Sequence, residues 1–262
     1  MSKEGKEIIS RRFSRAAPTY DEYALVQKES GVGLLSLLPE NFVSREILEI
    51  GCGTGGFTAR LADRFPQARI TAIDFAQGMI NQAGGKFGGR SHISFCCRDG
   101  EVFLRENRGK YDLVTSNATM QWFDDIEQAF GNAARALGEN GIFLASFFGP
   151  ESLRELATGL SAVLGKEVLV AAGYFAGKEK ISRLARNCFH DVMVSEKIYS
   201  RSYPTFRSLL NHISKTGTGG YHPSLPPLTG RKIAQLETWF NGKGGYDVTY
   251  QVFFLKASGR RG

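Results

Sequence analysis

The sequence predicts an α/β protein built on a seven-stranded, doubly wound sheet. In the first 150 residues, five short apolar segments alternate with segments of helical periodicity, and a glycine-rich turn follows the first apolar segment. Two further segments of strand character stand in the C-terminal part of the chain. Alternating strands and helices are typical of a parallel sheet, because right-handed crossovers place helices on both of its faces.

The first five strands are predicted from apolar runs that end in glycine, acidic or polar residues. The segment "EILEI" leads directly into "GCGTGG", and the next stretch, "FTARLADRF", repeats apolar residues at helical spacing. A second helix begins at "GMINQA" and is stopped by two glycines, and a third, "DIEQAFGNAARALG", ends at Gly138. The strands are predicted at 46–50, 68–74, 93–99, 111–118 and 141–148.

After Gly149 the alternation of strand and helix stops. Residues 150–190 are predicted to be mostly helical, 191–203 to form a long strand, 204–217 an amphipathic helix and 246–258 the closing strand. A terminal antiparallel pair of strands added to five parallel ones gives a seven-stranded sheet, and not a second nucleotide-binding half.

Polar residues follow the predicted parallel strands where each strand ends. Ligands of such sheets bind outside the carboxyl ends of the strands, so these residues are expected at one edge. They are Glu49 to Gly56, Asp74, Asp99 to Glu101, and Ser116 to Trp122.

The glycine turn is compatible with two kinds of adenosine-bearing cofactor. "GCGTGG" fits the G-x-G-x-x-G pattern of a dinucleotide site and equally the acidic-x-G-x-G-x-G pattern of an S-adenosylmethionine site, with Glu49 as the acid. A carboxylate at position 49 would repel a diphosphate but suits a cofactor that carries an ammonium group and a sulfonium. Asp99 and Glu101 add carboxylates at the same edge. We therefore expect S-adenosylmethionine, with a nicotinamide-dependent oxidoreductase as the less favoured alternative.

Composition excludes several other classes of protein. The 262 residues carry a formal net charge of +7, which permits an acidic partner. A nucleic-acid-binding arm would require a longer basic run, and no basic run in this sequence exceeds two residues. The N-terminus lacks the apolar region of a signal peptide, and no apolar run reaches the length of a membrane span. The four cysteines and four histidines show no metal-ligand spacing. We expect a cytoplasmic protein without a metal site, a membrane segment or a nucleic-acid partner.

The chain resembles class I S-adenosylmethionine-dependent methyltransferases, which have a Rossmann-like fold, through "EILEIGCGTG", "ITAID", "CRDGE" and "YDLVTSNATMQWF". With "FSRAAPTYDEYALVQ", "SNATMQW", "SYPTFRSLLNHISKTG" and "YDVTYQVFFLKA", it resembles more specifically the BioC family, malonyl-acyl-carrier-protein O-methyltransferases of biotin synthesis. The resemblance spans nearly the whole chain and is loosest at "HPSLPPLTGRK". It implies a single domain over 1–262, with lid helices in 1–30 and helical cap segments at 150–190 and 202–232.

The resemblance also implies roles for individual residues. The cofactor would be held at its methionine end by Glu49, Gly51, Gly53 and Gly55, at its ribose by Asp74, at its adenine by Phe75, Met79, Asp99, Gly100 and Glu101, near its methyl group by Asn117, and under a cover formed by Tyr20. Gln121 and Trp122 would form the substrate side, together with Tyr20.

The reaction that the resemblance implies is esterification of the free carboxylate of malonyl-acyl-carrier protein. A carboxylate is already ionised at neutral pH, so no catalytic base is expected. Because the ligand edge offers mainly acids, we expect the cap to supply the counter-charge, from Arg207 or Lys215. A related methyltransferase acting on another carboxylate or on a quinone-like carbon would share the same sequence core. Base methylation is disfavoured, because "NATMQW" replaces the Asn/Asp-Pro-Pro-aromatic segment of base-flipping enzymes.

Overall fold

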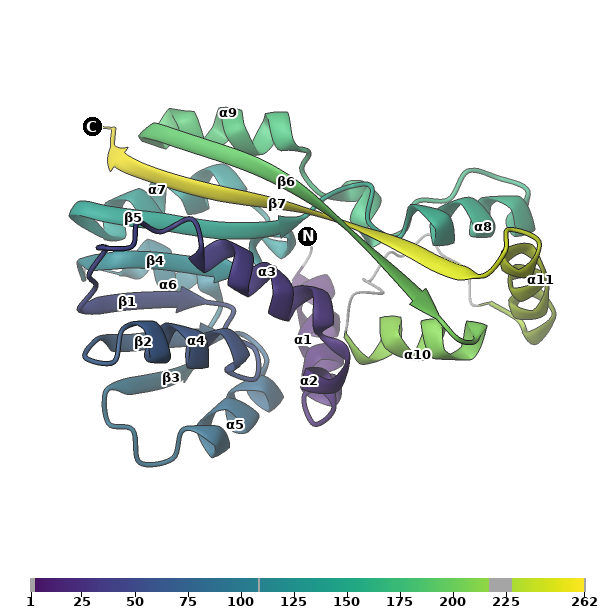
Figure 1. Cartoon of the computed structure of the whole chain (residues 1–262), viewed down its shortest axis with the longest axis horizontal. Coiled ribbons are helices and arrows are strands. Elements are labelled where there is room, and N and C mark those ends of the chain that lie inside the picture. Colours follow the sequence, from purple (N-terminus) through teal and green to yellow (C-terminus); the bar gives the residue numbers. More distant parts are fainter. Residues whose placement is uncertain (1–2, 108, 217–227, 262) are drawn as a thin grey trace.

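The computed structural model describes residues 3–107, 109–216 and 228–261 and contains a seven-stranded sheet with the order β3-β2-β1-β4-β5-β7-β6 (Figure 1). Strands β1 to β5 are parallel, and β7 is antiparallel to both of its neighbours. This confirms the predicted fold class. The strands are β1 (Glu46–Ile50), β2 (Arg69–Asp74), β3 (Ile93–Cys97), β4 (Tyr111–Asn117), β5 (Leu137–Phe148), β6 (Phe189–Tyr203) and β7 (Tyr246–Arg260).

Two apolar layers cover the sheet, because successive side chains of a strand point to opposite faces. On β1, Ile47 belongs to a core shared with α3 (Leu25–Leu35) and α4 (Gly56–Arg64), whereas Leu48 belongs to a core shared with α6 (Gly100–Glu106), α7 (Ile126–Ala136) and α9 (Lys178–Cys188). Both leave less than 1% of their surface exposed. Helices thus lie on both faces, as a doubly wound sheet requires.

The strand order reverses between β1 and β4, which lie side by side. At such a switch point the loops after the two strands diverge and leave room for a ligand. The loop after β1 is the glycine turn, and the loop after β4 leads into the short 3-10 helix η1 (Met120–Trp122). The topology therefore positions the predicted ligand edge.

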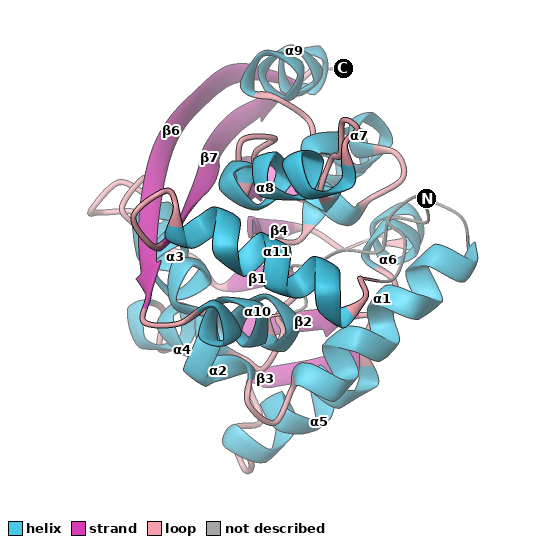
Figure 2. Ribbon diagram, turned by 90° about the vertical axis from the view of Figure 1, so that its right-hand side faces the viewer, coloured by secondary structure: helices cyan, strands magenta, loops and turns pink. Residues whose placement is uncertain are grey.

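Three N-terminal helices lie near that edge. They are α1 (Lys3–Ala16), α2 (Tyr20–Tyr23) and α3. Helix α1 runs beside α5 (Gln77–Lys86), as Figure 2 shows. The approach is close at Gly78, where an added Cβ would lie 2.6 Å from the backbone oxygen of Ser14. Glycine at this position lets α1 pack directly on α5.

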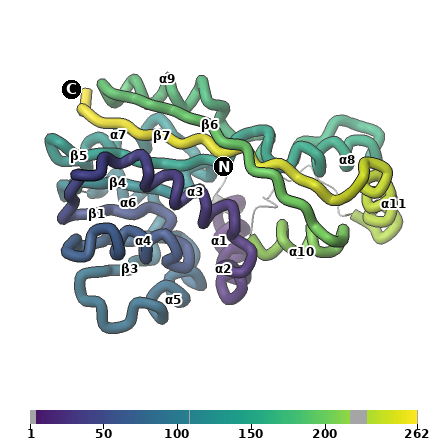
Figure 3. Tube along the Cα trace, in the orientation of Figure 1, coloured from purple at the N-terminus to yellow at the C-terminus, as the bar shows by residue number. Residues whose placement is uncertain are grey.

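The last two strands are longer than the parallel ones and carry the remaining helices. Pairing between β6 and β7 continues from Phe189 opposite Arg260 to Tyr203 opposite Tyr246. Figure 3 shows both strands extending past β5, and α8 (Arg154–Leu164), α10 (Phe206–Lys215) and α11 (Gly230–Asn241) pack around the extension. The 3-10 helix η2 (Ala171–Tyr174) precedes α9. The C-terminal pair of strands was predicted, but α11 was not.

Three predicted boundaries are wrong. The helix expected to be stopped by Gly84 and Gly85 continues through both glycines to Lys86. The helix expected to end at Gly138 ends at Ala136, and β5 already begins at Leu137. The strand expected to reach Asp99 ends at Cys97, because the Asp99 side chain caps α6 by accepting the backbone N–H groups of Glu101 and Val102. Within the described part of the chain, no helix combines the length and apolar character needed to cross a membrane.

Candidate active site

The glycine turn after β1 has a backbone that only glycine adopts readily. Gly51 has a φ of 75°, and a Cβ there would lie 2.1 Å from the Oγ1 atom of Thr119. Gly53 has a φ of 54°, and an added Cβ would have no described protein atom within 4 Å. Gly55, with a φ of 83°, caps α4 and faces Phe87. The turn therefore presents bare backbone to the space in front of Gly53.

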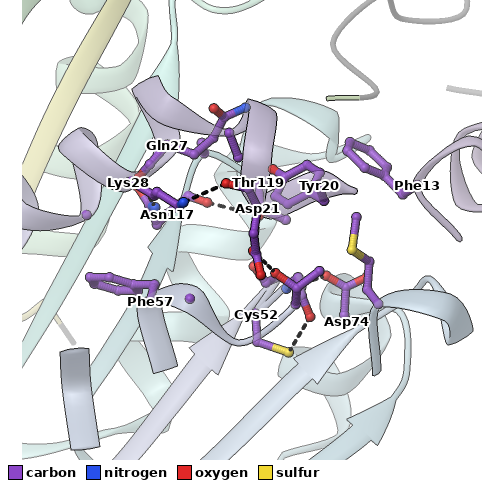
Figure 4. Close-up of a pocket in the computed structure, with 18 of the residues that line it drawn as sticks. Phe13, Tyr20, Asp21, Gln27, Lys28, Cys52, Phe57, Asp74, Asn117 and Thr119 are labelled. Carbon is purple, nitrogen blue, oxygen red and sulfur yellow. Dashed lines mark hydrogen bonds between the residues drawn. The ribbon is translucent and has the colours of Figure 1, made fainter. Parts of the chain in front are cut away.

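That space is a cavity with an empty volume of about 790 Å³, part of which is open to solvent, and it is here called the main cavity. Figure 4 shows its walls. They come from the N-terminal helices, the glycine turn and the ends of β2 and β4, and include Phe13, Tyr20, Asp21, Gln27, Lys28, Gly51, Gly53, Arg60, Asp74, Phe75, Met79, Asn117, Thr119 and Trp122. The structure thus brings together most of the residues predicted to hold a cofactor.

Asp74 ends β2 and is 8% exposed at the cavity wall. One carboxylate oxygen accepts the N–H of Gly53 at 2.9 Å, and the other accepts the N–H of Ala76 at 2.8 Å. Burial raises the pKa of Asp74 to about 6, although these backbone hydrogen bonds oppose the shift. Asp74 therefore fixes the glycine turn and also faces the cavity.

Glu49 lies beneath the turn and does not line the cavity. Its side chain is 1% exposed, and its carboxylate accepts a hydrogen bond from the Thr58 hydroxyl at 2.6 Å. Burial raises the pKa of Glu49 to about 8, and the nearby Asp74 carboxylate adds to the shift. Any effect of Glu49 on a ligand would pass through its charge or through the turn.

Asp99 and Gly100 line a neighbouring cavity of about 420 Å³, here called the rim cavity, which shares Gly51, Asp74 and Phe75 with the main cavity. Glu101 does not line it. The ammonium group of Lys6, from α1, lies 3.0 Å from Asp99 and also contacts Glu101 and Asp124. Burial opposes the charge of Lys6, but these hydrogen bonds outweigh it and raise its pKa. Sequence reasoning missed this lysine.

Glu101 holds the loop before α7 and does not face a cavity. Its carboxylate accepts the N–H groups of Asp124 and Asp125 at 2.9 to 3.2 Å, in addition to the contact with Lys6. The role predicted for Glu101 on an adenine amino group therefore has no geometric support in this structure. Asp99 and Gly100 remain at the rim.

Asn117 ends β4 at the wall of the main cavity, but its amide is engaged. Its oxygen accepts hydrogen bonds from the hydroxyls of Ser30 and Ser146, both at 2.7 Å, and its nitrogen donates to the backbone oxygen of Gln27 at 2.9 Å. Asn117 thereby ties α3 to the ends of β4 and β5.

A second opening, here called the side cavity, measures about 400 Å³ and adjoins the main cavity. The two share Phe13, Tyr20, Gln27, Ala118 and Trp122. The remaining residues of the side cavity are Gln121, Phe148, Ser152, Leu153, Ala172, Phe175, Thr216 and Tyr250. Gln121, Trp122 and Tyr20 thus stand where the sequence analysis expects the substrate side.

Trp122 lines all three cavities and is held between two aromatic rings. Its ring centroid lies 6.4 Å from that of Phe13 and 5.0 Å from that of Phe175, both edge to face. Phe13 comes from α1, and Phe175 comes from the segment that links η2 to α9. The Trp122 indole therefore contacts both the N-terminal helices and the segment that follows β5. Tyr20 completes the same wall, with its ring 6.4 Å from Phe13.

The two cations expected to bind the substrate lie elsewhere. Arg207 and Lys215 are exposed on α10, and neither lines the main, rim or side cavity. The apolar face of α10 is buried, as its pattern predicted, so its charged residues face away from the core. Part of the segment "HPSLPPLTGRK" lies outside the described residues.

Several cavity residues were not assigned roles from the sequence. Asp21 accepts hydrogen bonds from the Thr54 hydroxyl and from Lys86, which fastens α2 to the glycine turn and α5. Lys28 and Arg60 bring positive charge to the main cavity. Asp21 belongs to the segment "FSRAAPTYDEYALVQ", which carries part of the family resemblance, and Lys28 directly follows that segment. The sequence therefore marked this region but assigned a role to neither residue. In the described residues, no group of three or more His, Cys, Asp or Glu side chains could hold a metal ion.

Comparison with solved structures supports the fold. Phosphoethanolamine N-methyltransferase 2 from Haemonchus contortus superposes with a TM-score of 0.56 at 19% identity, over 88% of this chain and 52% of that one. N-methyltransferase NodS from Bradyrhizobium japonicum superposes with a TM-score of 0.53 at 17% identity, over 95% and 96%. At these identities the likeness concerns the fold alone.

Sequence comparison identifies the family. Residues 47–141 match the methyltransferase domain family. The malonyl-[acyl-carrier protein] O-methyltransferase of Bacillus cereus is 34% identical over 95% of this chain and 96% of its own length, and that of Acetivibrio thermocellus is 34% identical over 95% and 93%. The homologous enzyme of Geobacter sulfurreducens is 33% identical over 94% and 96%. Because these matches cover nearly the whole of both chains, this chain belongs to the malonyl-[acyl-carrier protein] O-methyltransferase family.

Proposed function

We propose that this protein transfers the methyl group of S-adenosylmethionine to the free carboxylate of a malonyl group carried on acyl-carrier protein. One observation carries the proposal in this chain: the main cavity and the side cavity meet at Phe13, Tyr20, Gln27, Ala118 and Trp122. A methyl donor in the main cavity and a methyl acceptor in the side cavity would then be neighbours. The family's place in biotin synthesis is part of the proposal.

The residues of the main and rim cavities suit S-adenosylmethionine. Asp74 would accept hydrogen bonds from the ribose hydroxyls, and the open backbone at Gly53 leaves room for the methionine portion. The adenine would lie beside Phe75 and Met79, toward Asp99 in the rim cavity. Lys28 and Arg60 are the cations of the main cavity that could pair with the methionine carboxylate. When bound, the cofactor supplies an electrophilic methyl group.

The protein's contribution to this chemistry is to position the reactants and exclude water. A carboxylate is ionised at neutral pH, so the nucleophile needs no base. Holding it about 3 to 3.5 Å from the methyl carbon can supply ~7–11 kcal/mol of the barrier. The N-terminal helices would cover the cofactor, with Tyr20 and Phe13 at the junction of the cavities. Removing water there strengthens electrostatic contacts.

The division of the chain is also part of the proposal. Residues 1–30 would form the lid, and 150–190 with 202–232 the cap that receives the acyl-carrier protein. The bonds of Lys6 and Asp21 to the parallel sheet domain support the lid, because they fix α1 and α2 at the ligand edge. The cytoplasmic location and the absence of a nucleic-acid partner stay predictions, which fractionation and a binding assay with duplex DNA would test.

A methyl-transfer assay tests the proposed function. Purified protein with radiolabelled S-adenosylmethionine is offered malonyl, succinyl and acetyl thioesters of acyl-carrier protein. We expect labelling of the malonyl thioester, weaker labelling of the succinyl thioester and none of the acetyl thioester, which lacks a free carboxylate. Equal labelling of all three would refute carboxyl methylation. Thermal stabilisation by NAD but not by S-adenosylhomocysteine would instead support the oxidoreductase alternative.

A further inference from the structure

The side cavity has no cationic wall among the described residues. Its lining is aromatic, aliphatic or polar and uncharged. Arg207 and Lys215 lie outside it, and the segment 217–227, outside the described residues, contains no lysine or arginine in its sequence. A buried carboxylate requires hydrogen-bond donors, and the described residues of the side cavity offer only uncharged ones.

Most hydroxyls that line only the side cavity are already committed. The Ser152 hydroxyl donates to the backbone oxygen of Gln251 at 3.1 Å. The Thr216 hydroxyl donates to the backbone oxygen of His212 at 2.9 Å. Neither hydrogen is available to a ligand without breaking an existing bond. Tyr250 carries the remaining hydroxyl of this group.

Tyr250, on β7, is 2% exposed, and its buried hydroxyl has no hydrogen-bond partner among the described residues. Its ring is held by its neighbours, with centroids 5.9 Å from Phe148 and 6.3 Å from His212. The hydroxyl of Tyr203 lies close enough to interact electrostatically with that of Tyr250. Neither hydroxyl has a partner at hydrogen-bonding distance and angle among the described residues. Leaving such a hydroxyl unsatisfied is costly, which points to a ligand that satisfies it. Burial raises the pKa of Tyr250, so the phenol keeps its hydrogen.

Gln121 is a second unsatisfied group in the same cavity. Its side chain is 9% exposed, and its amide nitrogen donates to the backbone oxygen of Ala118 at 2.8 Å. Its buried amide oxygen has no partner among the described residues. A ligand that brings both an acceptor for Tyr250 and an N–H donor for Gln121 would satisfy both. A malonyl group on a phosphopantetheine arm has a carboxylate and amide N–H groups.

We propose that the side cavity receives the acyl group and that Tyr250 donates its phenolic hydrogen to the malonyl carboxylate. This inference rests on the proposed function and assigns its acceptor site. A single hydroxyl engages one carboxylate oxygen and leaves the other available to attack the methyl group. An arginine would bind both oxygens in a bidentate pair. Tyr250 is thus a substrate-binding residue that recognises the carboxylate without an ion pair.

The test compares two Tyr→Phe variants that each remove one buried hydroxyl. Tyr250→Phe removes the proposed donor and keeps the ring. Tyr199→Phe is the matched control. Tyr199 faces Tyr250 across the β6–β7 pair and is 4% exposed, and its hydroxyl has no hydrogen-bond partner among the described residues. It lines none of the three cavities. Both variants are assayed on malonyl-carrier protein and on a small malonyl thioester, and for binding of that thioester in the presence of S-adenosylhomocysteine.

We expect Tyr250→Phe to lower kcat/KM about 10- to 150-fold on both substrates, the range for one hydrogen bond to a charged group. KM for S-adenosylmethionine should stay unchanged, and Tyr199→Phe should behave as the wild type. Wild-type kinetics and binding in Tyr250→Phe, or equal losses in both variants, would overturn the assignment of Tyr250. A wild-type protein that neither binds nor methylates malonyl thioesters would overturn the proposed function, and this inference with it.

Discussion

Cofactor affinity should rise with pH through the titration of Asp74. The free protein holds this carboxyl group with a pKa of about 6 because it is buried, and only the ionised form offers acceptors on both oxygens. At pH 5 about one tenth of the molecules carry the carboxylate, and at pH 7.5 nearly all do. The dissociation constant of S-adenosylhomocysteine should therefore fall about tenfold between these pH values.

Calorimetric titration over this pH range measures the effect, with two controls. Adenosine contains the ribose but neither the amino group nor the carboxylate of the methionine portion, so its affinity should show the same rise if Asp74 is responsible. In Asp74→Asn the rise should disappear, because position 74 no longer titrates. An affinity independent of pH, or an equal rise in Asp74→Asn, would refute the reasoning. A rise that is only beginning at pH 7.5 would point to Glu49 instead, because its pKa is about 8.

Three further predictions concern stability. Burial raises the folded-state pKa of Glu49 from 4.5 to about 8, so its protonated form stabilises the fold at low pH and this contribution is lost as the pH rises. Urea unfolding should therefore show a free energy of unfolding ~1 kcal/mol lower at pH 8 than at pH 7. Glu49→Gln should abolish the difference. Gly51→Ala should lower Tm far more than Gly53→Ala. Both glycines have a positive φ, which costs an alanine ~1–2 kcal/mol, but only at Gly51 would the added Cβ also clash, with Thr119. Equal Tm values would contradict this. Lys6→Ala should speed amide hydrogen exchange in α1, because three carboxylates lose the cation that they share. Arg11→Ala breaks only an exposed ion pair and should leave the exchange rate unchanged. Identical exchange in both variants would show that Lys6 does not fix α1.

The parallel part of the sheet was predictable because its signals are local. Apolar runs ended by glycine or an acid gave β1 to β5 within a few residues, and the turn pattern located Gly51 and Gly53. Asp74 could be placed at the cavity because strand ends of a parallel sheet share one edge. The boundary at Gly138 was missed because the helical pattern of α7 continues up to the residues that begin β5. The boundary at Asp99 was missed because the Asp99 side chain caps the next helix, α6, and so does not extend β3.

The contacts that redefine the site are not local. Lys6 reaches Asp99 and Glu101 across more than 90 residues, and nothing in either segment announces the pairing. The same holds for Tyr250, whose place at the side cavity depends on the register of β7 between β5 and β6. The counter-charge was expected from α10 because the ligand edge offers mainly acids and because this segment resembles the family. The helix instead turns Arg207 and Lys215 toward solvent.

The most direct test of the proposed function identifies the atom that receives the methyl group. The protein is incubated with S-adenosylmethionine carrying a labelled methyl group and with malonyl-carrier protein, and the product is treated with mild alkali. Methylation of the carboxylate gives an ester, so we expect the label to leave as methanol. Label that stays on a carbon of the acyl chain after hydrolysis would contradict esterification and would support a methyltransferase that acts on carbon.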